Sequence, residues 1–109
     1  MLKTSPSGAD EIVKVGDLAL NKVAFKVHRQ RREVHLGPTE YRLLVTLIEA
    51  PGRVFSRREL HHALWGDASD VDERTVDLHI ARLRKQINLG KEDEMIRTVR
   101  GQGYVLGDF

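Results

Sequence analysis

The sequence of 109 residues predicts an α+β domain that begins as a four-stranded antiparallel sheet, continues as three helices and closes as a β-hairpin. Three observations predict this order. Four brief apolar runs, separated by polar or turn residues, occupy the first third of the chain. Three segments with apolar residues at helical spacing follow. Two short apolar runs around a glycine-containing turn end the chain.

The predicted sheet is a meander, because its apolar runs are too short for helices and each is followed by turn residues. In the third run, Val23, Phe25 and Val27 alternate with Ala or Lys, which would give the strand one apolar face. Residues 1–11 contain Ser, Pro and Gly without periodicity, so we interpret them as a linker or an added leader, and residues 12–109 as the domain. The four predicted strands are Ile12–Val15, Leu18–Leu20, Val23–Val27 and Glu33–Leu36.

Start and stop signals define the first two helices. Pro38 is expected at the first position of the first helix, where a backbone N–H would have no partner and proline has none. Pro51 lies just beyond the predicted end of the same helix. Ser56 and Glu59 have the spacing of a capping box, which opens a second, short helix that Gly66 would end. The intervening stretch "RVF" can form one short strand.

The third helix combines a narrow apolar stripe with an opposite face of cations and small or apolar side chains. Asp72, or alternatively Asp70, would cap its N-terminus, and it would run to about Asn88. The outward face suits a DNA major groove, where phosphates attract Lys and Arg and thymine methyl groups take apolar contacts. An ordinary surface helix is the alternative. The stripe is Val76, Ile80, Leu83 and Ile87; the outward face is Arg74, Leu78, Ala81, Arg82 and Lys85, with Thr75 and His79 on its flank.

The C-terminal hairpin, "IRTVRGQGYVL", places an arginine at its tip. A two-residue loop "GQ" suits a type II′ turn, which takes glycine first. That register pairs Arg100 with Gly103 and Val99 with Tyr104. Arg100 would then project beyond the body of the domain.

Composition and charge narrow the function classes. The net charge is only +2, but the basic stretch "HRQRR" is separate in the sequence from the acidic stretches "GDASDVDE" and "EDE". This separation favours a basic face that binds a polyanion and a separate acidic face. The alternative is an ordinary solvated surface. There is no cysteine, and no apolar run reaches the length of a membrane span, so we expect a soluble cytoplasmic protein without membrane contact. The five histidines lack metal-site spacing and no phosphate loop is present; we expect no enzyme activity, no metal and no cofactor.

Helices followed by a hairpin form a winged-helix plan, to which the N-terminal sheet is an addition. The motifs "LGPTEYRLL", "PGRVFSRREL", "LWG", "VDERTVDLHIARLRKQI" and "IRTVRGQGY" resemble, in order and spacing, the DNA-binding effector domain of OmpR-family response regulators. The resemblance covers about residues 12–107. Within the family, the PhoB-like activators of the phosphate regulon look nearest. A sibling regulator of another regulon, or a winged helix that mainly binds proteins, is the alternative.

The resemblance implies that the third helix enters the major groove and the hairpin, or wing, reaches the minor groove of double-stranded DNA. At two positions, this sequence fits the implied DNA contacts less well. PhoB-like sequences often have Arg where this chain has Ala81, and Arg84 lies nearer the core flank than the outward face. Asp77 is expected to pair with a base such as Arg84. Carried over by motif, the DNA-binding residues are Arg74, Thr75, Leu78, His79, Arg82 and Arg84 from the helix, Thr98 and Arg100 from the wing, and Arg57 from the start of the second helix.

The resemblance also implies partners. The loop between the second and third helices contacts the RNA polymerase sigma factor in PhoB-like activators; an alternative is that its acids only stabilise the helix N-terminus. Tandem domains of this kind bind direct-repeat sites. A phosphorylatable receiver domain would belong to the parent protein. The polymerase-facing residues would be Gly66, Asp67, Asp70, Asp72 and Glu73, with Trp65 mainly in the core.

Overall fold

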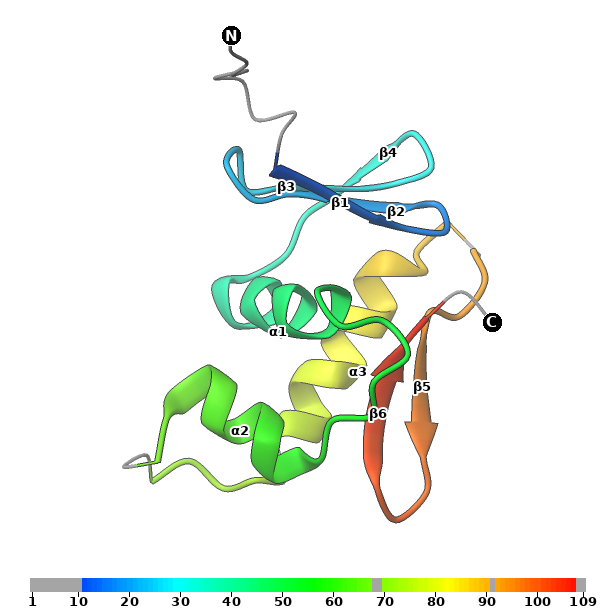
Figure 1. Cartoon of the computed structure of the whole chain (residues 1–109). Helices are drawn as coiled ribbons and strands as arrows, with labels where there is room; N and C mark the ends of the chain where they lie inside the picture. Colours follow the sequence, from blue (N-terminus) through cyan, green and yellow to red (C-terminus); the bar gives the residue numbers. More distant parts are fainter. Residues whose placement is uncertain (1–10, 68–69, 91, 108–109) are drawn as a thin grey trace, which may run out of the picture.

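The order of elements is the one that the sequence predicts, with the sheet above α1 and the upper end of α3, and the hairpin beside α3 (Figure 1). The computed structural model describes residues 11–67, 70–90 and 92–107, so nearly all of the segment interpreted as a linker lies outside it. The elements are β1 (Ile12–Val15), β2 (Leu18–Asn21), β3 (Lys26–Arg29), β4 (Arg32–Val34), α1 (Pro38–Ile48), α2 (Arg57–Trp65), α3 (Thr75–Ile87), β5 (Ile96–Val99) and β6 (Gly103–Leu106).

The N-terminal sheet is an antiparallel meander with the order β1-β2-β3-β4. Leu20 is paired with Val27, and Val27 with Val34, so one row of apolar side chains runs across the sheet. All three are buried. This row faces the helices, which is why a sheet of such short strands can hold its register.

The third strand differs from the prediction: it begins at Lys26, and Val23 and Phe25 lie in the preceding turn. The side chain of Asn21 accepts hydrogen bonds from two successive backbone N–H groups, the first that of Val23, at 3.1 and 3.0 Å. Phe25 has a φ of 54° and is 72% exposed. A side-chain-stabilised turn therefore overrides the alternating apolar pattern, which was read wrongly at these two positions.

The predicted boundaries of α1 and α2 are confirmed. Pro38 stands at the first position of α1. In α2, the Ser56 hydroxyl accepts from the backbone N–H of Glu59 at 3.0 Å, and the Glu59 carboxylate accepts from the N–H of Ser56 at 2.9 Å. These reciprocal bonds satisfy two otherwise free donors at the start of the helix.

Helix α3 begins at Thr75, later than predicted. Asp72 still acts as a cap, but of the turn that leads into the helix: its carboxylate accepts from the N–H of Arg74 at 2.8 Å, and its carbonyl accepts from the N–H of Thr75 at 2.9 Å. The predicted apolar stripe of α3 is confirmed, since Val76, Ile80, Leu83 and Ile87 are at most 1% exposed.

The hairpin register is shifted by one residue from the prediction, with Val99 opposite Gly103 and Thr98 opposite Tyr104. The N–H of Gln102 donates to the carbonyl of Val99 at 2.9 Å. Gly101, with a φ of 75°, is thus the third residue of its turn, as in type II rather than type II′.

A contact from outside the hairpin holds β6 against the loop before α2. Phe55 and Tyr104 exchange two backbone hydrogen bonds of 2.8 and 2.9 Å, so the predicted "RVF" strand is a single bridge. A Cβ at Gly103 would lie 1.9 Å from the carbonyl oxygen of Phe55. Glycine is therefore required at this close approach, which nothing in the hairpin's own sequence indicates.

Among the residues that the structure describes, no helix combines the length and apolar character that crossing a membrane would need.

Candidate functional site

The outward face of α3 lies opposite its buried stripe and carries exposed Ala81, Arg82 and Lys85, with Leu78 49% exposed. Within the described ranges, no acidic side chain forms an ion pair with Arg82 or Lys85. The predicted combination of free cations and apolar groups on one helix face is therefore present in three dimensions.

The start of α3 is also exposed, but its cation has a partner. Arg74 donates to the carboxylate of Asp72 at 3.2 Å, and the Arg74 side chain is 82% exposed. The backbone N–H of Arg74, and then its guanidinium, hold the pKa of Asp72 below its usual value. Thr75 is half-buried next to it. Arg74 can still reach outward because its pairing is at the solvent-exposed end of the helix.

His79 is placed between helices rather than on the outward face. Its side chain is 13% exposed, and Nδ1 lies 2.5 Å from the Glu40 carboxylate on α1. The ring of Trp65 on α2 lies 5.7 Å from that of His79, centroid to centroid. His79 thus joins α3 to α1 and α2, and a direct contact with DNA remains only a prediction from the resemblance.

Arg84 fastens the wing to α3. Its Nε and Nη2 atoms donate to the carbonyl of Ile96 at 3.1 and 3.0 Å, and Nη2 also donates to the Thr98 hydroxyl at 2.9 Å. The guanidinium carbon lies 5.5 Å from the centre of the Tyr104 ring. Both predicted DNA contacts, Arg84 and Thr98, therefore have a structural role within the domain, in line with the position of Arg84 near the core flank.

Asp77 pairs with a base, as expected, but that base is Arg57 and not Arg84, the example that the sequence suggested. The Nε and Nη2 atoms of Arg57 each lie 2.9 Å from a different oxygen of Asp77. The hydroxyl of Tyr104 donates to the same carboxylate at 2.5 Å. Burial raises the pKa of Tyr104 and the bond to Asp77 raises it further, so the hydroxyl remains a donor at neutral pH.

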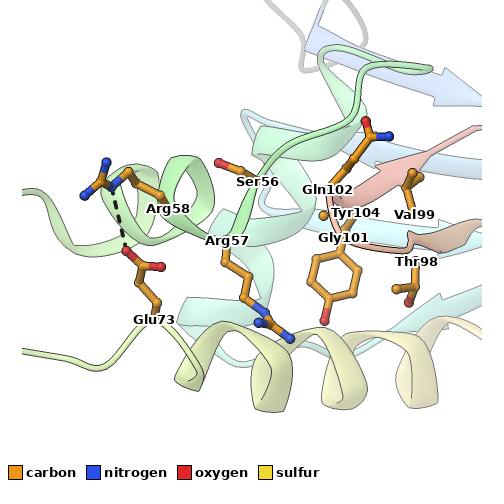
Figure 2. Close-up of a pocket in the computed structure, with 10 residues that line it drawn as sticks. Ser56, Arg57, Arg58, Glu73, Thr98, Val99, Gly101, Gln102 and Tyr104 are labelled. Atoms are coloured by element: carbon orange, nitrogen blue, oxygen red, sulfur yellow. Dashed lines mark ion pairs between the residues drawn. The ribbon is translucent and has the colours of Figure 1, made fainter.

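A groove of about 310 Å³ separates the start of α2 from the wing. Figure 2 shows the side chains of Arg57 and Tyr104 descending side by side toward α3, with Gln102 pointing the other way. Arg58 lies on the opposite wall, 3.8 Å from the carboxylate of Glu73. Arg100 is exposed in the turn of the wing and forms no ion pair with any residue of the described ranges. The cations that line the groove, Arg57 and Arg58, thus come from the start of α2.

Two arginines partly neutralise the acidic loop after α2: Arg74 pairs with Asp72, and Arg58 with Glu73. Gly66 ends α2 with a φ of 79°. Asp67 lies 2.7 Å from His62, and Glu73 faces Arg58. Asp70 is exposed, while residues 68 and 69 lie outside the described ranges. The loop is less uniformly acidic than its sequence implies, and its role as a polymerase contact stays a prediction.

The basic run "HRQRR" does not form a free cationic face. Arg29 is fully buried, and its guanidinium donates to Asp17 at 2.6 Å, to the Ile87 carbonyl at 3.1 Å, to Asn88 at 2.7 Å and to the Asp93 carbonyl at 2.5 Å. The expected separation of basic and acidic stretches is wrong here, because tertiary folding brings them together. Sequence reasoning missed this role, since no local pattern marks one arginine as buried.

A second arginine of that run, Arg32, binds the same C-terminal end of α3. Arg32 donates to the carbonyls of Gln86 and Ile87 at 3.2 and 3.0 Å and pairs with Glu92 at 3.0 Å. Two arginines from the sheet thus cap the C-terminus of α3, where free carbonyls and the helix dipole favour cations. No group of three or more metal-ligating side chains occurs among the residues described.

Comparisons with known proteins agree with this geometry. A family model described as "Transcriptional regulatory protein, C terminal" matches residues 31–106. The phosphate regulon transcriptional regulatory protein PhoB of Rhizobium meliloti is 49% identical over 104 residues, which are 95% of this chain and 46% of that protein. The chain therefore spans about half the length of this relative.

Two solved structures share the fold over most of the chain. The RstA DNA-binding domain of Klebsiella pneumoniae in complex with the RstA box has a TM-score of 0.78 and 30% identity, covering 89% of this chain and 97% of that one. The DNA-binding domain of the response regulator AdeR, in complex with an intercistronic region, has a TM-score of 0.79 and 31% identity, covering 88% and 99%.

Proposed function

The chain belongs to the transcriptional regulatory protein C-terminal family, the OmpR/PhoB type of winged helix, and we propose that it recognises specific sequences in double-stranded DNA through α3 and the β5–β6 wing. The observation that carries the proposal is the outward face of α3, with Arg82 and Lys85 exposed beside Leu78 and Ala81. A protein-binding face would favour aromatic and aliphatic anchors instead of free cations.

Each element has a distinct part in the proposed complex. α3 lies in the major groove, where Arg82, Lys85 and Arg74 meet phosphates or base edges and Leu78 offers an apolar contact to thymine methyl groups. The wing lies over the adjacent minor groove, with Arg100 as its reader. Arg57 meets a phosphate at the groove between α2 and the wing. The weakest candidates are Arg84, Thr98 and His79, because internal hydrogen bonds already engage them.

The parent protein is a response regulator whose receiver domain precedes this domain, which begins at about residue 12. The family description names a C-terminal region, and half of the PhoB relative lies beyond the match, which supports this arrangement. The 49% identity also supports a cytoplasmic activator of the phosphate regulon. The acidic loop, 66–73, is the surface offered to the polymerase sigma factor, with exposed Asp70 at its centre.

Selection of bound duplexes from a random DNA pool tests the proposal. We expect enriched direct repeats spaced by about one helical turn, as tandem domains on one face of DNA require. Binding should also weaken steeply with salt, because phosphate contacts release counterions. A pool without enrichment would rule out sequence-specific recognition. A flat plot of log K against log [salt] would point to a partner that is not a polyanion.

The wing is tested by Arg100→Ala. If the guanidinium enters a narrow minor groove, the variant should lose about 1–3 kcal/mol of binding free energy, mostly on sites with A·T pairs under the wing. Fluorescence anisotropy with a selected duplex measures the loss. Arg31→Ala, an exposed arginine at the sheet, is the control for removal of one charge. Equal binding by the two variants would remove Arg100 from the proposed interface.

A further inference from the structure

The acid Asp77 lies within the proposed DNA-binding surface. Asp77 lies on α3, its side chain is 36% exposed, and the groove between α2 and the wing lies beside its partners. A carboxylate near DNA phosphates is repelled by them, and the repulsion is strongest at low salt. A surface selected only for affinity would place a neutral residue there, so Asp77 must contribute something else.

The geometry of Asp77 indicates what that contribution is. One of its oxygens accepts hydrogen bonds from Nε of Arg57 at the start of α2 and from the hydroxyl of Tyr104 in β6, and the other forms an ion pair with Nη2 of Arg57. One carboxylate therefore joins the three elements that would meet DNA: α2, α3 and the wing. No other acid of the described surface touches all three.

The pairing leaves Arg57 able to bind a phosphate. A guanidinium has five N–H groups. The Nε–H group of Arg57 donates to Asp77, and Nη2 forms an ion pair with the same carboxylate. The Tyr104 hydroxyl is a further hydrogen-bond partner of the Arg57 side chain. These contacts do not use all five N–H groups, so donors of Arg57 remain for another acceptor. A two-point contact with a carboxylate fixes the plane of the guanidinium, so the remaining donors point in a set direction before DNA arrives.

We propose that Asp77 is a positioning residue that lowers the affinity of the domain for any DNA and raises its preference for the correct sequence. It does so by holding Arg57 and the wing in register with the base-reading face of α3. The proposal rests on the DNA-binding function proposed above, and it assigns Asp77 no contact with DNA.

Glu73 provides a matched control. It lines the same groove and faces a cation, Arg58, but at 3.8 Å, and the Arg58 side chain is 89% exposed. It makes no contact with Tyr104. Glu73→Gln and Asp77→Asn thus remove the same charge from the same region, and only the second removes the link between the elements.

The test compares Asp77→Asn, Glu73→Gln and Tyr104→Phe by anisotropy on a selected duplex and on a scrambled one. Both charge removals should tighten binding to the scrambled duplex by roughly 2- to 5-fold, the scale of one exposed charge interaction. Only Asp77→Asn should lower the ratio of selected to scrambled affinity, by about tenfold, within the range of losing one base contact. Tyr104→Phe keeps the charge, so it should leave scrambled binding unchanged and reduce discrimination only at the base pairs under the wing.

A measurement without DNA separates this proposal from the proposed function. In the free protein, the Nε–H signal of Arg57 in ¹⁵N NMR should be sharp and protected from exchange; the variant Arg57→Lys assigns this signal. Asp77→Asn should broaden the signal, and Glu73→Gln should leave it unchanged. A signal that is already averaged in the wild type overturns the proposal. So does an unchanged affinity ratio in Asp77→Asn, or an equal loss on both duplexes, which would mean only general destabilisation. If no duplex is selected at all, the proposed function fails, and the NMR result still decides whether Asp77 fixes Arg57.

Discussion

The C-terminal end of α3 and its outward face are both rich in cations, and the structure uses them in opposite ways. At the C-terminal end, Arg29 and Arg32 come from the sheet and donate to backbone carbonyls and acids. On the outward face, Arg82 and Lys85 are exposed. A count of basic residues therefore does not locate a polyanion site. A cation whose donors are already used stabilises the fold, and a cation left with free donors can bind a ligand.

The largest expected effect is on stability, at the buried end. Arg29→Ala should lower the free energy of unfolding by about 3–5 kcal/mol, because Asp17 and the carbonyls of Ile87 and Asp93 would lose a buried, charged donor. Urea denaturation measures the change. Arg31→Ala, two residues away and exposed, should stay within about 0.5 kcal/mol of the wild type. Similar losses in both variants would contradict the distinction between the two kinds of cation.

The next effect is on binding, at the outward face. Arg82→Ala should weaken binding to a selected duplex by about 1–3 kcal/mol if it meets a base edge, or reduce the salt slope by about 1 if it meets a phosphate. Its unfolding free energy should not change, since the side chain is exposed. Anisotropy titrations at several salt concentrations distinguish the two contacts. A stability loss without a binding loss would mean that Arg82 belongs with the structural cations.

The smallest effect is in the pH dependence at the buried end. Burial raises the pKa of Asp17, but hydrogen bonds from Arg29 and Gln30 outweigh it and hold the pKa below the ordinary value of 3.8. Asp17 therefore contributes stability above its unfolded pKa and loses that contribution as the pH falls through the folded value. Since its side chain is 35% exposed, the contribution is modest. Asp17→Asn should flatten the loss of stability below about pH 4 in acid titrations of the urea midpoint; an unchanged acid limb would mean that this pair does not matter to folding.

Local signals predicted much of the fold. The capping box at Ser56, the proline at the start of α1 and the apolar stripe of α3 each act over one helical turn, and all three are confirmed. Two local signals were overruled by stronger ones. The side chain of Asn21 closes a turn where Val23 and Phe25 alternate, and a turn with Gly101 in third place shifts the hairpin by one residue.

The candidate site divides in the same way. The spacing of Leu78, Arg82 and Lys85 along one helix predicts which side chains share a face, because a helix fixes those angles by itself. It predicts nothing about the partners of those side chains. Arg84 and Thr98, expected on the DNA, bind each other, and His79 binds Glu40 across 39 positions of the chain.

The sequence by itself determined the element order, the helix boundaries to within a few residues, and the family, because these depend on periodicity, caps and short motifs. The tertiary structure alone decided which charged residues bind other groups of the domain and so stabilise the fold. Burial of Arg29 and the convergence of Arg57 and Tyr104 on Asp77 depend on segments that meet only after folding. A charge's effect depends on the dielectric and the donors around it, and neither is a property of the residues beside it in the chain.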